Sequence, residues 1–171
     1  MSAASRRSAP PRRAPVVLRD IELSLPLQLL KAREAAMARF RPMLRHHGLT
    51  EQQWRVIRVL AACPRIDASD LARRSFLLAP SLTRILQECE RRQMVSRTAH
   101  DSDQRRALFA LTAAGKRLFA TVAPDSERLY ESISAEFGKR KLATLYSLLA
   151  EFATALTGAV AVGDVKGDGR C

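Results

Sequence analysis

The chain has 171 residues, of which 47% are hydrophobic and only 5% aromatic, so its core must be filled by Leu, Ala and Val. This length suits one domain, or a small domain with a dimerisation extension. Lys and Arg number 29 against 17 Asp and Glu, which gives a net charge of +12. Five arginines precede Asp20, the first acidic residue, but the rest of the chain is also basic. This balance predicts a polyanionic partner.

Several classes of protein are excluded by what the sequence lacks. No apolar run approaches the roughly 20 residues that span a bilayer, and no secretory signal is present. Three cysteines without paired spacing favour a reducing, cytoplasmic compartment. There is no glycine-rich phosphate loop, nucleophile elbow or His-Glu-x-x-His motif, so we expect neither an enzyme nor a cofactor. His46 and His47 are adjacent and point about 100° apart on a helix, so no metal site is expected.

The N-terminal part is predicted to be a disordered basic leader followed by a long helix. Residues 1–19 are rich in Arg, Pro, Ala and Ser and cannot bury enough apolar surface to become ordered. This leader is either solvated, which we favour, or an arm along phosphate. Residues 20–48 are predicted to form a helix that begins or is interrupted near Pro26, can kink at Pro42 and ends at Gly48.

A second helix is predicted to begin at a capping box. Thr50 and Gln53 have the spacing at which each side chain satisfies the backbone N–H of the other. The helix buries Trp54 and stops before Pro64. Residues 64–67 could form a minimal strand that pairs with a later hairpin.

The next stretch predicts a helix-turn-helix. A short helix over residues 67–74 begins with an Asp cap, and residues 80–91 form an amphipathic helix with Pro80 in its first turn. The residues of this second helix that share an inward face are Leu82, Ile85, Leu86 and Cys89. Its opposite face carries hydroxyls, a guanidinium and an amide, which are groups that read base edges and phosphates.

A basic-tipped hairpin follows the two helices. Residues 94–99 and 107–112 are prone to form strands, and they flank a polar, charged tip at 100–106. Helix, turn, helix and hairpin make a winged helix-turn-helix, which binds DNA. We assign residues 49–115 to this DNA-binding domain.

The C-terminal part is predicted to be helical. One helix runs from residue 112 to 137 with a break or bend at Pro124, and a last helix covers residues 140–161. The last helix carries an apolar stripe: Leu142, Leu145, Tyr146, Leu149, Phe152 and Leu156. Such a stripe needs a partner. The expected fold is therefore mainly α, with residues 20–48 and 116–161 forming a helical dimerisation region and 162–171 a flexible tail.

The hairpin resembles the wing of the MarR family of bacterial transcriptional regulators. Asp103-x-Arg105 precedes Leu111-Thr112 at the end of the second strand, and Gly115 completes the D-x-R … L-T-x-x-G spacing of that family. The resemblance implies a homodimer on a pseudo-palindromic operator, with a recognition helix in each major groove and a wing in the adjacent minor groove.

Three further segments, residues 33–42, 49–55 and 80–83, are similar to family members that repress the degradation of aromatic acids such as hydroxyphenylacetate. The resemblance covers about residues 23–156. It leaves both tails outside.

The resemblance implies roles for the candidate DNA-binding residues. Arg105 would lie at the wing tip in the minor groove, and Asp103 would orient it by a charge-assisted hydrogen bond. Arg106 is either a phosphate contact or solvated. The recognition-helix contacts are Ser81, Thr83, Arg84 and Gln87, and the phosphate contacts expected from charge alone are Arg73, Arg74 and Arg97. The alternatives are a solvated helix face and a surface salt bridge without a role.

Many relatives bind small aromatic acids between the dimerisation helices and the winged domain, so the resemblance also implies a ligand site. The candidates are Arg33 and Arg41 for a carboxylate, Met37, Phe40 and Trp54 for apolar walls, and His46 or His47 for a phenol. The alternative is that Trp54 is simply core and that the histidines cap a helix.

We therefore expect a dimeric, cytoplasmic, sequence-specific DNA-binding regulator. It would repress an aromatic-compound catabolic operon and be released by a small phenolic acid. The expected partners are double-stranded operator DNA, a second copy of the chain and a small aromatic carboxylate or phenol, with no membrane. The alternative is a basic, non-specific architectural protein without a ligand response.

Overall fold

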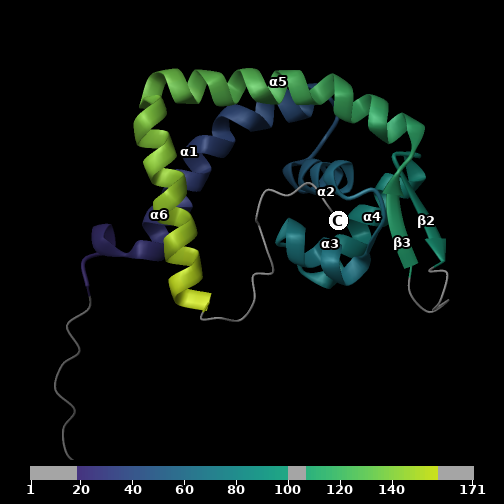
Figure 1. Cartoon of the computed structure of the whole chain (residues 1–171), viewed down its shortest axis with the longest axis horizontal. Coiled ribbons are helices and arrows are strands. Elements are labelled where there is room, and N and C mark those ends of the chain that lie inside the picture. Colours follow the sequence, from purple (N-terminus) through teal and green to yellow (C-terminus); the bar gives the residue numbers. More distant parts are fainter. Residues whose placement is uncertain (1–18, 100–106, 158–171) are drawn as a thin grey trace, which may run out of the picture. The chain divides into compact units, whose positions relative to one another are not determined.

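The computed structural model describes residues 19–99 and 107–157 (Figure 1). Residues 1–18 of the expected leader, the charged hairpin tip and the expected flexible tail lie outside the described residues. The chain divides into two compact units, residues 1–36 and 37–171.

The first unit contains η1 (Ile21–Leu23) and the beginning of α1 (Leu25–His46). Asp20 caps η1, because its carboxylate accepts the N–H of Glu22 at 3.0 Å. α1 starts one residue before Pro26, where a missing N–H interrupts no helical hydrogen bond. The expectation that the helix begins near Pro26 is confirmed.

α1 continues into the second unit through Pro42 and is followed by Gly48 in the left-handed conformation, with φ at +64°. The predicted capping box is confirmed. The Thr50 hydroxyl accepts the N–H of Gln53 at 3.1 Å, and the Gln53 side chain accepts the N–H of Thr50 at 2.9 Å. This box opens α2 (Glu51–Ala62).

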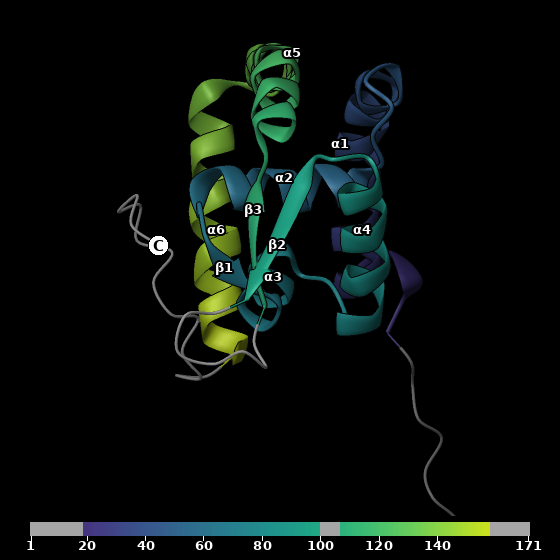
Figure 2. The same ribbon diagram turned by 90° about the vertical axis from the view of Figure 1, so that its right-hand side faces the viewer.

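The predicted winged-helix elements follow in order: β1 (Ile66–Asp67), α3 (Ala68–Ser75), α4 (Ala79–Arg91), β2 (Val95–Ala99) and β3 (Ala107–Leu111). β3 lies between β1 and β2 and is antiparallel to both (Figure 2). Phe109 of β3 pairs with Ile66 on one side and with Arg97 on the other. Asp67 caps α3 by accepting the N–H of Asp70 at 2.9 Å. The minimal strand, the Asp cap and the hairpin are thus confirmed.

The core of this region is aliphatic, as the composition predicted. α2, α3, α4 and the sheet contribute its most deeply buried side chains, which include Val56, Ile57, Leu60, Leu71, Leu82 and Cys89. Each large apolar side chain buried in this way contributes about 1.5–3 kcal/mol to folding. Because α4 packs its inward face into this core, the core fixes the orientation of the exposed face of α4.

The C-terminal helices are α5 (Ala113–Phe137) and α6 (Lys139–Thr157). The expected break at Pro124 is wrong in one respect, because α5 continues through it without interruption. Val122 and Ser126 beside it are buried, and their packing offsets the hydrogen bond that proline cannot make. Gly138, with φ at +98°, separates the two helices as predicted.

α6 exposes most of its apolar stripe in the single chain. The large apolar side chains that it exposes are Leu145, Tyr146, Leu148, Leu149 and Leu156. None of the helices in the described parts of the chain is long and apolar enough to cross a membrane.

Two of the three cysteines lie in the described part of the chain. Cys89 is a free, buried thiol, and burial raises its pKa to about 11, so it stays protonated near neutral pH. Cys63 is also buried, with 2% of its surface exposed.

Candidate nucleic-acid interface and ligand site

α4 divides into a buried and an exposed face. The residues that pack into the core, none more than 8% exposed, are Leu82, Ile85, Leu86 and Cys89. The opposite face exposes Thr83, Arg84 and Gln87, with Ser81 half-buried. The Thr83 hydroxyl donates to the carbonyl of Ala79 at 3.0 Å, so its oxygen is left to accept from an outside donor. This face offers a guanidinium, an amide and hydroxyl oxygens, which pair with base edges in a major groove.

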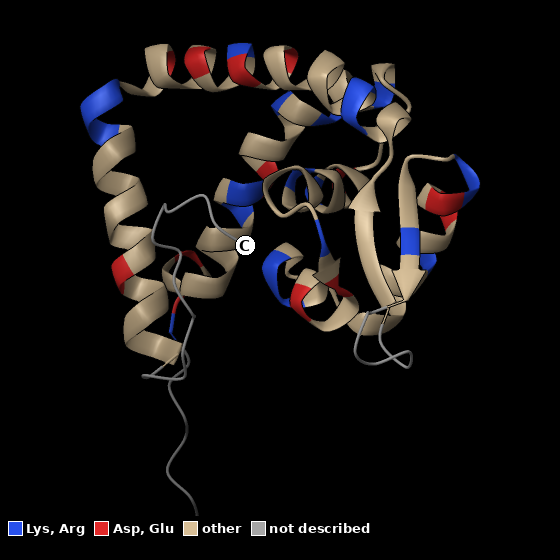
Figure 3. Cartoon of the chain, turned by 45° about the vertical axis from the view of Figure 1, so that its right-hand side comes forward, with Lys and Arg blue, Asp and Glu red and all other residues tan. Residues whose placement is uncertain are grey.

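Lys and Arg residues occur along the helices and strands of the winged-helix region, as the blue parts of the ribbon in Figure 3 show. Arg73 on α3 pairs with Asp70 at 2.9 Å, and both side chains are about half exposed. Arg74 donates to the sulfur of Cys63 at 3.3 Å, and Arg97 is exposed on β2. An exposed ion pair contributes at most about 1 kcal/mol, so phosphate can replace the carboxylate of Asp70. The wing-tip candidates Asp103, Arg105 and Arg106 lie outside the described residues.

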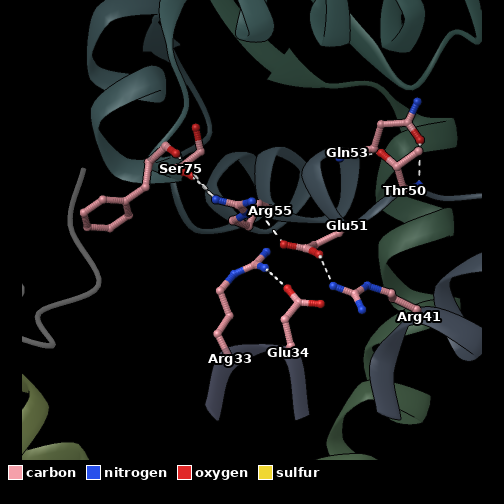
Figure 4. Close-up of polar contacts among 9 residues, drawn as sticks. Arg33, Glu34, Arg41, Thr50, Glu51, Gln53, Arg55 and Ser75 are labelled. Atoms are coloured by element: carbon pink, nitrogen blue, oxygen red, sulfur yellow. Dashed lines mark hydrogen bonds and ion pairs between the residues drawn. The ribbon is translucent and has the colours of Figure 1, made fainter. Parts of the chain in front are cut away.

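Arg55 stabilises the turn that leads into α4 by hydrogen bonds (Figure 4). Its guanidinium donates to the carbonyls of Ser75 at 3.1 Å and Phe76 at 3.5 Å. The same group lies 3.3 Å from Glu51, whose carboxylate is also 3.7 Å from Arg41. Sequence reasoning missed this role, because nothing in the local pattern of α2 indicates that Arg55 reaches a turn 20 residues away.

We expect Arg55→Met to lower the free energy of unfolding by about 1–2 kcal/mol, because two turn carbonyls lose a charged donor. Urea denaturation measures this change. Arg41→Met is the matched control, since it removes the other arginine that lies beside Glu51. Equal losses in both variants would show that the turn bonds of Arg55 contribute nothing.

An aromatic cluster lies where α1, α2 and α5 meet. The rings of Phe40 and Tyr130 have centroids 4.9 Å apart, and those of Trp54 and Phe119 are stacked at 5.6 Å. Arg58 donates to the Tyr130 hydroxyl at 3.1 Å, and its guanidinium carbon lies 6.0 Å from the centroid of that ring. The cluster therefore combines apolar walls with an exposed cation and a phenol.

Arg58 and Tyr130 were missed by sequence reasoning. Arg58 follows Trp54 by four residues, so the two share a face of α2, and this spacing could have indicated the cation. Tyr130 lies 72 residues further along the chain, and no local signal connects it to Arg58.

The ligand candidates chosen from sequence divide into two groups. Phe40 and Trp54 are buried in the core and Met37 packs against it, so they can form walls. The polar candidates face protein partners: Arg33 lies 2.6 Å from Glu34, Arg41 lies 3.7 Å from Glu51, and His47 lies 2.7 Å from Asp125. His46 contacts the ring of His47 edge-on.

The contact between His47 and Asp125 joins the end of α1 to α5. The hydrogen bond from His47 holds the pKa of Asp125 below its ordinary value, and the charge of Arg128 acts in the same direction. The ionised carboxylate is therefore the form that the fold stabilises. Because the pKa of Asp125 is lower in the folded protein than in the unfolded chain, the stabilisation is fully present above the pKa of the unfolded state. It is lost as the pH falls through the pKa of the folded state.

We expect the wild type to lose stability below about pH 4 more steeply than Asp125→Asn, because the variant has no carboxylate to protonate. Urea denaturation at a series of pH values measures the difference. Glu127→Gln, at an exposed carboxylate two residues away, is the matched control and should follow the wild type. Parallel curves for all three proteins would contradict the assignment.

A shallow hollow of about 300 Å³ lies elsewhere, where α5 meets α6. Its lining residues are Phe137, Arg140, Lys141, Thr144, Leu145 and Leu148. None of the ligand candidates chosen from sequence lines it. Across the described residues, no group of three or more His, Cys, Asp or Glu side chains could hold a metal ion.

Comparison with known proteins agrees with the winged helix. The MarR family model matches residues 47–106. The homoprotocatechuate degradative operon repressor of Escherichia coli is 46% identical over 129 residues, which are 75% of this chain and 87% of the relative. Transcriptional regulator PA4135 is similar in structure, with 46% identity, a TM-score of 0.73, and coverage of 76% of this chain and 96% of its own.

NadR in complex with 4-hydroxyphenylacetate is a further solved relative. It is 38% identical with a TM-score of 0.70, and the match covers 81% of this chain and 99% of NadR. These identities extend over nearly the whole length of each relative and include the helices on both sides of the winged helix. The chain thus belongs to the MarR family of DNA-binding transcriptional regulators.

Proposed function

We propose that the protein is a dimeric repressor that binds a specific operator and releases it when a small phenolic acid binds. The observation that carries this proposal is the two-faced α4, whose core-packed side holds the polar side outward. The proposed base contacts are Ser81, Thr83, Arg84 and Gln87, and the proposed phosphate contacts are Arg73, Arg74, Arg97 and Arg106. Arg105, oriented by Asp103, would enter the minor groove.

Arg84→Ala is expected to weaken binding to the operator by about 1–3 kcal/mol per half-site and to relax preference at one base position. The reason is that a guanidinium on the exposed face can make two hydrogen bonds to one guanine. Binding to a panel of operators with single base changes measures this effect. The matched control is Arg73→Ala, a phosphate contact, which should weaken all duplexes alike. If Arg84→Ala left the preference for each base unchanged, α4 would not be the helix that reads the operator sequence.

Dimerisation through the N- and C-terminal helices is proposed from the exposed apolar stripe of α6. Residues 20–48 and 116–161 would form this region, and residues 49–115 would bind DNA. A second copy of the chain is the partner that fits, because two equivalent stripes can cover each other about a two-fold axis. Two-fold symmetry also fits a pseudo-palindromic operator whose half-sites lie about one helical turn apart.

The phenolic acid is proposed to bind at the aromatic cluster of Phe40, Trp54, Arg58, Phe119 and Tyr130. Arg58 would pair with the carboxylate, the Tyr130 hydroxyl would exchange its bond with Arg58 for one to the ligand, and the rings would flank the aromatic part. Four further residues are secondary candidates for contacts with the ligand: Arg33, Met37, Arg41 and His47. They would have to exchange or extend their present contacts to reach it.

Two relatives support this chemistry. NadR is solved with 4-hydroxyphenylacetate, and the Escherichia coli relative is a repressor of a homoprotocatechuate degradative operon. We propose that the present protein likewise controls an operon for aromatic-compound catabolism and works in the cytoplasm, where operator DNA and its ligand meet.

A non-specific architectural role is the alternative, and the net charge of +12 is the observation that favours it. Both roles involve phosphate contacts, so salt dependence alone does not separate them. The ratio of affinities for operator and random duplex does, because an architectural protein binds both alike.

A further inference from the structure

The turn between α3 and α4 exposes two large apolar side chains. Phe76 is 86% exposed and Leu78 is 78% exposed, whereas Leu77 between them packs against the core. Isolated apolar residues are ordinary on protein surfaces. Phe76 and Leu78, however, flank Leu77 and lie directly before α4, the helix that is proposed to read DNA.

Neither side chain suits its backbone position. Phe76 has φ at +51° and ψ at +48°, the left-handed conformation at a helix C-terminus that glycine favours. Leu78 is the N-cap of α4 and makes no side-chain capping bond, where Ser, Thr, Asp or Asn would. The stability of the folded chain therefore does not explain why a phenylalanine lies at position 76 or a leucine at position 78.

The turn that carries the pair is held firmly by hydrogen bonds. The guanidinium of Arg55 donates to the carbonyls of Ser75 and Phe76, as Figure 4 shows for Arg55 and Ser75. The N–H of Leu77 donates to the carbonyl of Ala72 at 3.0 Å. The two apolar side chains are thus presented from a fixed backbone, which limits the entropy lost when they bind.

We infer that Phe76 and Leu78 contact thymine methyl groups in the major groove and determine a thymine preference within each operator half-site. This inference rests on the proposed entry of α4 into that groove. The C5-methyl of thymine is the apolar group that base edges display there, and apolar side chains recognise it. Leu78 is the N-cap of α4 and Phe76 lies two residues before it, so the thymines lie at the end of the half-site that the N-terminus of α4 reaches.

Deoxyuridine differs from thymine only in lacking this methyl group, which gives a direct test. The operator is first located by footprinting in the DNA upstream of the gene. Matched duplexes are then made with thymine or with deoxyuridine throughout the footprint. We expect the wild type to bind the deoxyuridine duplex about fourfold more weakly for each methyl group that is covered.

The double variant Phe76→Gly/Leu78→Ser should bind both duplexes with nearly equal affinity. It should also fold at least as stably as the wild type, because each new residue suits its backbone position. Leu78→Met with Phe76 retained is the matched control, and it should keep most of the discrimination because the side chain stays apolar.

Two results would overturn the inference while leaving operator binding intact. One is a wild type that does not discriminate between the duplexes. The other is a double variant that discriminates as strongly as the wild type, which would assign the methyl groups to other residues. If the oligomeric state of that double variant also changes, the pair contacts protein instead of DNA. Equal binding of the wild type to operator and random duplex would instead refute the proposed function.

Discussion

Gly115→Ala is expected to lower the free energy of unfolding by about 3 kcal/mol or more. A β-carbon on Gly115 would lie 2.0 Å from the carbonyl oxygen of Met94, which is backbone and cannot rotate away. The same carbonyl accepts the N–H of Thr112 at 3.1 Å, and the Thr112 hydroxyl donates to the carbonyl of Gln93 at 2.6 Å. Moving Met94 would therefore break the junction between the start of β2 and the start of α5. Urea denaturation measures the loss.

Gly48→Ala is the matched control for this prediction. Gly48 has φ at +64°, but a β-carbon there would have its nearest neighbour at 3.6 Å, the end of the Arg92 side chain. Only the backbone strain of about 1–2 kcal/mol remains. If Gly115→Ala were no more destabilising than Gly48→Ala, the close approach of α5 to Met94 would be refuted.

Arg58→Gln is expected to lower the affinity for a phenolic acid, with 4-hydroxyphenylacetate as the probe, by about 100-fold, or about 2.7 kcal/mol. The reason is that the variant removes the cation that lies over the Tyr130 ring and would leave a ligand carboxylate without its charged partner. Isothermal titration calorimetry with the purified protein measures the change, and the operator complex of the variant should persist at ligand concentrations that release the wild type.

Two matched variants separate the possible locations of this ligand. Arg140→Gln changes a cation that lines the hollow between α5 and α6, and Arg41→Gln changes the arginine beside Glu51. Both should change the affinity much less than Arg58→Gln does. A larger loss in Arg140→Gln would place the ligand in the hollow, and a larger loss in Arg41→Gln would restore the candidate chosen from sequence.

The elements that sequence predicted correctly are those with local signals. Thr50 and Gln53 lie three residues apart, Asp67 directly precedes its helix, and the inward residues of α4 recur with helical spacing. The wing pattern also has a physical reason. Thr112 caps α5 through the N–H of Gly115 at 3.0 Å, and Gly115 is the residue that fits beneath Met94. The L-T-x-x-G part of the motif, from Leu111 to Gly115, is therefore a junction in the fold.

What sequence did not predict depends on contacts distant along the chain. Pro124 does not break α5, because its buried neighbours hold the helix together. Arg55 reaches a turn 20 residues later, and Arg58 reaches Tyr130 72 residues later, so neither partner could be found by spacing. Arg41 and His47 have the right chemistry for a ligand, but the fold directs them to Glu51 and Asp125.

We propose that this MarR-family protein recognises one operator and releases it on binding a phenolic acid. Fluorescence anisotropy with the DNA upstream of its own gene, at near-physiological salt and with excess random duplex, measures the recognition of the operator. A panel of aromatic acids is then titrated into the complex. We predict tight binding that resists the competitor and is released by one phenolic acid. Equal affinity for both duplexes would contradict the claim and would indicate a basic architectural protein.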